Sequence, residues 1–112
     1  VNQSRSDGAT PALIAAQKGH TAALDVLVEA GCDVNRAAKD GSTPAHFAAL
    51  NGHRASLELL AKAGCDVNQK TKDGRTPAYL AVQKGQAASL EILVKAGCDV
   101  NQADKAGLAL GH

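Results

Sequence analysis

The chain has 112 residues, of which 45% are hydrophobic, and its 12 Lys and Arg nearly balance its 11 Asp and Glu. This length fits one small domain, and a net charge of +1 argues against nucleic acid or an anionic membrane as the partner. One Tyr, one Phe and no Trp exclude aromatic cages and base-stacking platforms. No apolar run approaches the roughly 18 residues of a membrane helix, and no signal peptide is visible.

A repeat of 33 residues organises the sequence. The segment Ala-Gly-Cys-Asp-Val-Asn occurs unchanged at 30–35, 63–68 and 96–101. Residues 8–40 and 41–73 are identical at 19 of 33 positions, and residues 41–73 and 74–106 at 20 of 33. The chain is therefore a tandem array of three units, and its fold follows from one of them.

The first helix of the middle unit is predicted at about 44–51. Thr43 is a good N-cap, and Pro44 suits the first helical position because its missing N–H would be unpaired there. The helix is rich in Ala, which allows neighbouring backbones to approach closely. Gly52 is expected to end it, since glycine tolerates the left-handed conformation of a helix C-terminus.

The second helix of the unit is predicted at about 54–63. Leu57, Leu60 and Ala61 form an apolar stripe with helical spacing, and Gly64 closes the helix. An extended loop follows, which turns at the sequence Asp-Gly. Two helices this short are not stable alone in water, so each unit must bury its stripe against the next. The prediction is an all-α solenoid of stacked antiparallel helix pairs linked by β-turn loops.

These features resemble the ankyrin repeat. The likeness rests on residues 43–49 (Thr-Pro-Ala-His-Phe-Ala-Ala), on Gly52-His53, and on residues 66–68 (Asp-Val-Asn). The Leu of the family's Thr-Pro-Leu-His motif is replaced by Ala12, Ala45 and Ala78, and its His is kept only as His46. Any Thr–His hydrogen bond of that motif is therefore expected in the middle unit alone.

The resemblance covers residues 1–107 and divides them into repeats. The predicted units are 8–40, 41–73 and 74–106, preceded by the end of another repeat at 1–7 and followed by a tail at 108–112. Neither end shows a polar capping repeat, so we expect either a monomer or weak end-to-end self-association. The chain is predicted to be a fragment of a longer repeat protein.

Three Cys and four His invite a metal or catalytic interpretation, but their spacing opposes it. Equivalent Cys lie one repeat apart, about 8–10 Å, which is too far for a shared zinc ion or a disulfide. We expect Cys32, Cys65 and Cys98 to be mostly buried, unligated thiols, which suits an intracellular setting, cytoplasmic or nuclear. No nucleophile, base and carboxylate are grouped, so we predict no enzyme activity, no metal and no cofactor.

In proteins that resemble this one, partners commonly meet the loop tips and the exposed side of the inner helices. We therefore expect a non-catalytic protein–protein interaction module that binds a protein with an acidic segment through a mainly basic surface, with Leu50 as an apolar anchor. The predicted contact residues lie in the loops that lead into the second and third units and in the inner helices of those units: Lys39, Asp40, Ser42, Leu50, Asn51, Lys70, Lys72, Asp73, Arg75, Gln83 and Lys84.

Two further interpretations stay open at the level of sequence. Similar proteins can be hydroxylated at the Asn of Asp-Val-Asn, here Asn35, Asn68 and Asn101, although such an Asn can also serve only to satisfy loop backbone groups. The array could alternatively be a designed or consensus-derived protein without a natural partner. Sequence variation at core positions argues against that alternative. Ile14, Phe47 and Leu80 occupy equivalent positions in the three units, where a consensus design would normally repeat one residue. A nucleic-acid-binding solenoid is disfavoured because it would need more aromatic rings.

Overall fold

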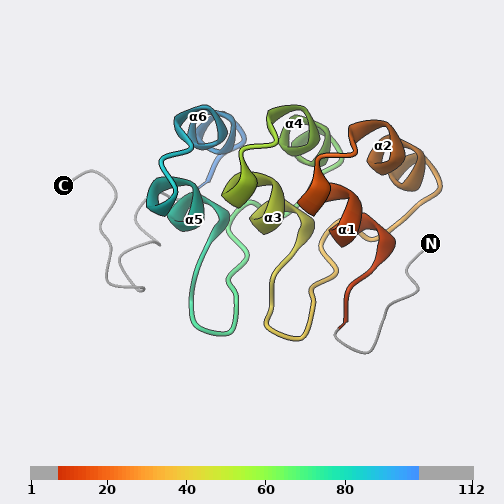
Figure 1. The fold of residues 1–112 in the computed structure, drawn as a ribbon, viewed down its shortest axis with the longest axis horizontal. Coiled ribbons are helices and arrows are strands. Elements are labelled where there is room, and N and C mark those ends of the chain that lie inside the picture. Colours follow the sequence, from red (N-terminus) through yellow and green to blue (C-terminus); the bar gives the residue numbers. More distant parts are fainter. Residues whose placement is uncertain (1–7, 99–112) are drawn as a thin grey trace.

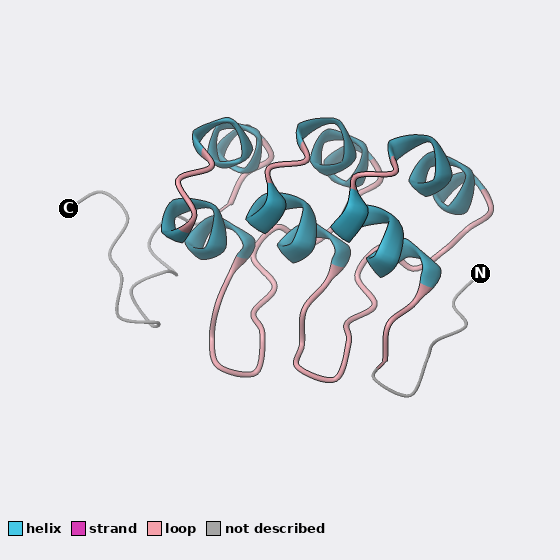
Figure 2. Cartoon of the chain, viewed as in Figure 1, coloured by secondary structure: helices cyan, strands magenta, loops and turns pink. Residues whose placement is uncertain are grey.

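The computed structural model describes residues 8–98, which form six helices and no strand. The helices are α1 (Pro11–Lys18), α2 (Thr21–Glu29), α3 (Pro44–Asn51), α4 (Arg54–Lys62), α5 (Pro77–Gln83) and α6 (Ala87–Lys95). They stack as three helix pairs in two layers, with α1, α3 and α5 in the inner layer and α2, α4 and α6 in the outer one (Figure 1). The long loops all project to one side, beyond the inner helices (Figure 2).

The predicted helices of the middle unit are confirmed, with one small shift. The first spans 44–51 as expected, and the second ends at Lys62, one residue earlier than predicted. The expected parts of the array at 1–7 and 99–106, and the expected tail at 108–112, lie outside the described residues.

Each inner helix begins at a Thr-Pro pair. The Thr10, Thr43 and Thr76 backbones are extended, and each hydroxyl accepts a hydrogen bond from the N–H three residues ahead. This satisfies one of the donors that a helix N-terminus leaves unpaired, and the proline that follows removes another. The three inner helices therefore start in register, one repeat apart.

Inner helices α1 and α3 end at glycines that no other residue could replace without strain. Gly52 has a φ of 71°, and a Cβ there would lie 2.6 Å from the side-chain oxygen of Gln86 in the next repeat. The left-handed conformation strains any other residue, and a side chain there would also displace the end of the Gln86 side chain. The glycine thus ends the helix and also allows the next repeat to pack against it.

The core is built from alanine between the inner helices and leucine between the layers. Ala12, Ala45 and Ala78 are buried at equivalent positions, and Leu57, Leu60 and Leu93 have no exposed surface. Small side chains let α1, α3 and α5 pack closely side by side, while the larger leucines fill the space beneath the outer helices. The inner and outer helices consequently share one continuous hydrophobic core.

The repeats are also joined by side chains that bond the backbone of the preceding repeat. Asn51 Nδ2 and His53 Nε2 both donate to the Gln17 carbonyl, at 3.1 and 2.9 Å, and Gln86 donates to the Leu50 carbonyl at 3.3 Å. These carbonyls lie at the ends of inner helices, where no intrahelical partner exists. Adjacent units therefore cannot separate without losing hydrogen bonds.

The cysteines are less buried than we expected. Cys32, Cys65 and Cys98 are free thiols that are only partly buried, although each packs against the core. The reason is their place just after the helix-ending glycines, where the chain leaves the core for the loop. Within residues 8–98, no helix is both long enough and apolar enough to cross a lipid bilayer.

Candidate functional site

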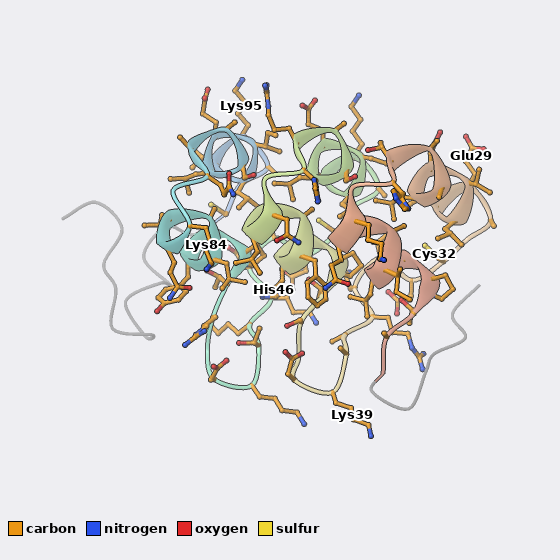
Figure 3. All side chains as sticks on the ribbon, viewed as in Figure 1. Glu29, Cys32, Lys39, His46, Lys84 and Lys95 are labelled. Carbon is orange, nitrogen blue, oxygen red and sulfur yellow. The ribbon has the colours of Figure 1, made fainter. Side chains whose placement is uncertain are left out.

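The candidate site is the side of the molecule that the loops reach. We call it the finger face and define it as residues 37–42 and 70–75, the exposed residues of α1, α3 and α5, and Lys84 at the end of α5. Lys39 extends from a loop tip on this side, whereas Glu29 and Lys95 project from the outer helices (Figure 3). The finger face and the outer helices are therefore two separate surfaces.

Each loop tip is a closed turn that its own side chains stabilise. The Asp40 carboxylate accepts hydrogen bonds from the backbone N–H and the hydroxyl of Ser42, at 2.9 and 3.0 Å. In the next loop, the Thr71 hydroxyl donates to Asp73 at 2.5 Å and accepts from the Arg75 N–H at 3.1 Å. Short polar side chains thus fix the shape of both turns.

The two described loop tips are stacked directly on one another. The Lys72 N–H donates to the Asp40 carbonyl at 2.9 Å. Gly41 has a φ of 88°, and a Cβ on it would lie 2.8 Å from the Lys72 nitrogen. The glycine permits both the turn and the contact, so the tips form a continuous rigid edge.

The predicted contact residues are not equally available at this surface. Lys39, Asp40, Asn51, Lys72, Asp73, Gln83 and Lys84 are exposed, and Leu50, Lys70 and Arg75 are partly buried. Ser42 is only 8% exposed and bonds Asp40, so it shapes the turn and presents little surface. Asn51 is exposed but also holds α3 to α1 through the Gln17 carbonyl.

Arg75 is held in place by two neighbours. Its guanidinium lies 3.5 Å from the Asp73 carboxylate and 5.6 Å from the centre of the Tyr79 ring. The hydrogen bond from Thr71, with the nearby Arg75 charge, lowers the pKa of Asp73. The charge of Arg75 is therefore partly balanced, and Lys39 and Lys72 present the less compensated positive charge.

The charges of the described residues differ between the two surfaces. The finger face carries six cations and two carboxylates: Lys18, Lys39, Lys70, Lys72, Arg75 and Lys84 against Asp40 and Asp73. The outer helices carry three cations and four carboxylates: Arg54, Lys62 and Lys95 against Asp25, Glu29, Glu58 and Glu91. Only the finger face has a clear sign, and it is positive.

A pocket between α1 and α3 is the feature that sequence analysis missed. It has a volume of about 350 Å³, and its lining includes Ile14, Gln17, Lys39 and Phe47. Ile14 and Phe47 occupy equivalent positions in adjacent repeats, and both were interpreted from the sequence as core positions at which the residue type varies. Their partial exposure was not predicted, although an aromatic ring at an otherwise aliphatic position was a signal available in the sequence.

His46 lies beneath the finger face and is structural. Its Nδ1 accepts from the Thr43 N–H at 3.1 Å and lies 2.8 Å from the Thr43 hydroxyl, so the proton is on Nε2, which donates to the Arg75 carbonyl at 2.9 Å. Burial lowers the pKa of His46 and favours the neutral ring. The expected Thr–His hydrogen bond of the middle unit is confirmed.

Of the asparagines proposed for hydroxylation, Asn35 and Asn68 lie in the loops that follow α2 and α4. The Asn35 side-chain oxygen accepts from the Asp66 N–H of the next repeat at 2.6 Å. The Asn68 backbone N–H donates to the Asp66 carboxylate at 2.9 Å, and Asn101 lies outside the described residues. The Asn35 side chain thus pairs with a backbone N–H of the next loop, and hydroxylation stays a prediction.

Residues 8–98 hold no group of three His, Cys, Asp or Glu that could bind a metal ion. Burial, together with the adjacent Asp66 carboxylate, raises the pKa of Cys65 to about 11. Burial also raises the pKa of Cys32. Since thiolates, not thiols, bind metals and attack electrophiles, these two thiols are poorly suited to either role.

Comparison with known proteins agrees with this architecture. A family model described as Ankyrin repeats (3 copies) matches residues 13–104, from α1 to beyond α6. A search of curated proteins finds no match. The matched region contains the short inner helices, the outer helices and the projecting loops described above. The chain belongs to the ankyrin repeat family.

Proposed function

We propose that this chain is a non-catalytic protein-interaction module that contacts its partner through the finger face. Ankyrin repeats are generally protein-interaction modules, and this chain carries three copies. The observation that carries the choice of surface is the charge difference. Six cations and two carboxylates lie on the finger face, against three and four on the outer helices. An acidic segment of a partner would be steered to the finger face.

The rigidity of the surface supports the same proposal. The Lys72 N–H bonds the Asp40 carbonyl at 2.9 Å, and the His46 ring bonds the Arg75 carbonyl at 2.9 Å. Binding therefore requires little ordering of the loops, and the entropy cost of immobilising them has already been met in the free protein. Charged side chains on a rigid frame are suited to selective contact with a partner.

The proposal extends to the setting of the module. We infer that it is part of a longer natural repeat protein, works inside the cell as a monomer or with weak end-to-end self-association, and has no metal or cofactor. The three partly buried thiols are free, as expected for a reducing compartment. The alternative, a designed array without a natural partner, predicts no selective capture of any cellular protein.

A pair of charge-reversal variants tests the proposal. Lys39→Glu with Lys72→Glu reverses two exposed loop-tip charges, and Lys62→Glu with Lys95→Glu makes the matched change on outer helices α4 and α6. Proteins captured from a cell lysate by the unaltered chain should be lost from the first variant and kept by the second. Loss in the second variant alone would place the interaction on the outer helices, and capture of nothing by the unaltered chain would favour the designed alternative.

A further inference from the structure

We infer that the finger face binds an extended acidic segment of its partner and seats one bulky apolar side chain of that segment in the pocket between α1 and α3. This inference rests on the proposed function, and it names the chemistry that the surface would recognise. The predicted anchor point is the pocket in the first and second repeats, and it differs from the sequence-based expectation of an anchor at Leu50.

The pocket has the size and lining for one side chain. Its volume of about 350 Å³ lies at the lower end of the about 300–1,000 Å³ usual for ligand pockets. Leu13, Ile14 and Phe47 supply apolar walls, and Ala9 and Ala38 leave room because their side chains are small. A Leu, Ile or Phe of a partner would bury apolar surface here, which is the usual role of an anchor residue.

The rim of the pocket favours negative charge in the ligand next to that anchor. Lys39 lines the pocket, and its ammonium group has no ion pair or hydrogen bond with any described residue. Asp40 also lines the rim, but both of its carboxylate oxygens accept hydrogen bonds from Ser42. These bonds hold the Asp40 carboxylate in its own turn but leave its charge, so the attraction for an acidic segment comes from the finger face as a whole, with six cations and two carboxylates.

A second cation lies one repeat away from Lys39. Lys72 is the equivalent of Lys39 in the next repeat, and its exposed side chain likewise has no partner among residues 8–98. Neighbouring repeats are about 8–10 Å apart, and an extended chain advances about 3.3 Å per residue. The ligand should therefore carry acidic residues beside the apolar anchor and again about three positions away from it.

The larger groove between outer helices α4 and α6 does not support a comparable inference. Its volume is about 530 Å³, but Arg54, Lys62 and Lys95 alternate there with Glu58 and Glu91. Cations and carboxylates are interspersed on this rim, and the outer helices around it carry three cations and four carboxylates, so the surrounding surface does not attract one sign of ligand. The pocket between α1 and α3 has an apolar interior and lies on the finger face, where six cations outnumber two carboxylates, and that combination specifies a ligand.

Selection from a library of random 12-residue peptides displayed on phage tests the inference with the intact chain. The enriched peptides should share one bulky apolar residue, with Asp or Glu beside it and about three positions away. The strongest peptide, made with a fluorescent label, should bind in anisotropy titrations and lose affinity as salt is added. No enrichment, or enrichment of peptides without this pattern, would overturn the inference. The proposed function would still be judged by capture of folded proteins.

Matched variants locate the peptide. Ile14→Glu places a carboxylate in the pocket and should weaken binding about 10-fold or more, as loss of an anchor contact does. Val26→Glu, on a side chain 66% exposed on α2, should leave binding unchanged. Equal affinity for the Ile14→Glu variant, with circular dichroism showing both variants folded, would contradict the pocket assignment.

A charge swap separates specific pairing from general attraction. The Lys39→Glu, Lys72→Glu protein should bind the acidic peptide about 10-fold or more weakly, because opposing charges steer and hold the ligand. It should recover affinity for the same peptide with its acidic residues changed to Lys. No recovery would show that these two lysines do not contact the ligand, and the inference would then fail.

Discussion

His46 shows how a single side chain joins two repeats. Its ring bonds Thr43 at the start of its own helix and the Arg75 carbonyl in the following loop, at 2.9 Å. Leu13 and Tyr79 occupy the equivalent positions, and the helix caps there depend on threonine alone. His46 is therefore a specific link between the second and third units, and it stabilises the loop that carries Lys72.

This link predicts a dependence of stability on pH. Burial holds the pKa of His46 below its ordinary value of 6.5, so the unfolded chain binds a proton first as the pH falls. Its contribution to stability is full above about pH 6.5 and is lost as the pH falls toward the folded pKa, with a slope of up to about 1.4 kcal/mol per pH unit. Urea unfolding between pH 5 and 7.5 measures this slope.

Replacing the ring should remove that dependence. The His46→Leu protein should be less stable at pH 7.5 by about 1–3 kcal/mol, because buried hydrogen-bonding groups lose their partner. Its stability should change less between pH 7 and 5.5 than that of the unaltered chain. The same pH slope in both proteins would show that His46 is not the group responsible.

Cys65 should react slowly with thiol reagents. With a pKa of about 11, on the order of one thiol in a thousand is ionised at pH 8, and the thiolate is the reactive form. Alkylation by iodoacetamide, followed by peptide mass spectrometry, should therefore be about 100-fold slower at Cys65 than in a small thiol peptide. Alkylation of Cys65 at the rate of the small peptide would contradict its partly buried position against the core.

At the scale of helices and loops, the local signals in the sequence were sufficient for the boundaries. Thr43-Pro44 starts α3 and Gly52 ends it because capping depends on residues within a few positions. The pocket could not be predicted in the same way. Ile14 and Phe47 are 33 residues apart, and only the packing of α1 against α3 brings them together around a cavity.

The same limit applies to the loop residues. Ser42 and Arg75 were predicted as contacts because they lie at the loop tips, but Ser42 bonds Asp40 and Arg75 pairs with Asp73. Such pairing depends on the conformation of the turn, which composition alone does not give. Sequence indicated which side carries positive charge, and the structure shows which of these charges are compensated.

The stacking of loop tips predicts an unequal effect of two glycine substitutions. Gly41 and Gly64 have φ values of 88° and 84°, but a Cβ would contact a neighbour only at Gly41, 2.8 Å from the Lys72 nitrogen. Gly64→Ala should cost roughly 1–2 kcal/mol for the left-handed conformation. Gly41→Ala should cost about 1–3 kcal/mol more, because the second loop must move. Equal losses in urea unfolding would mean that the tips are not in close contact.

At the scale of the whole molecule, each repeat provides the surface that buries its neighbour. Val26 is 66% exposed, whereas its equivalents Leu59 and Ile92 are partly buried and pack against the core. Stability in such arrays depends on the interfaces between units as much as on the units themselves. The weak end-to-end association expected from sequence stays a prediction, and sedimentation at increasing concentration would detect it.

The rigid frame and the surface charge together define the central claim, which is that partners bind the finger face. Hydrogen–deuterium exchange of the chain in complex with a protein it captures tests this most directly. We predict slower exchange at residues 37–42 and 70–75 and at the ends of α1 and α3, with exchange in α2, α4 and α6 unchanged. Protection confined to the outer helices, with the loop tips exchanging as in the free protein, would contradict the claim.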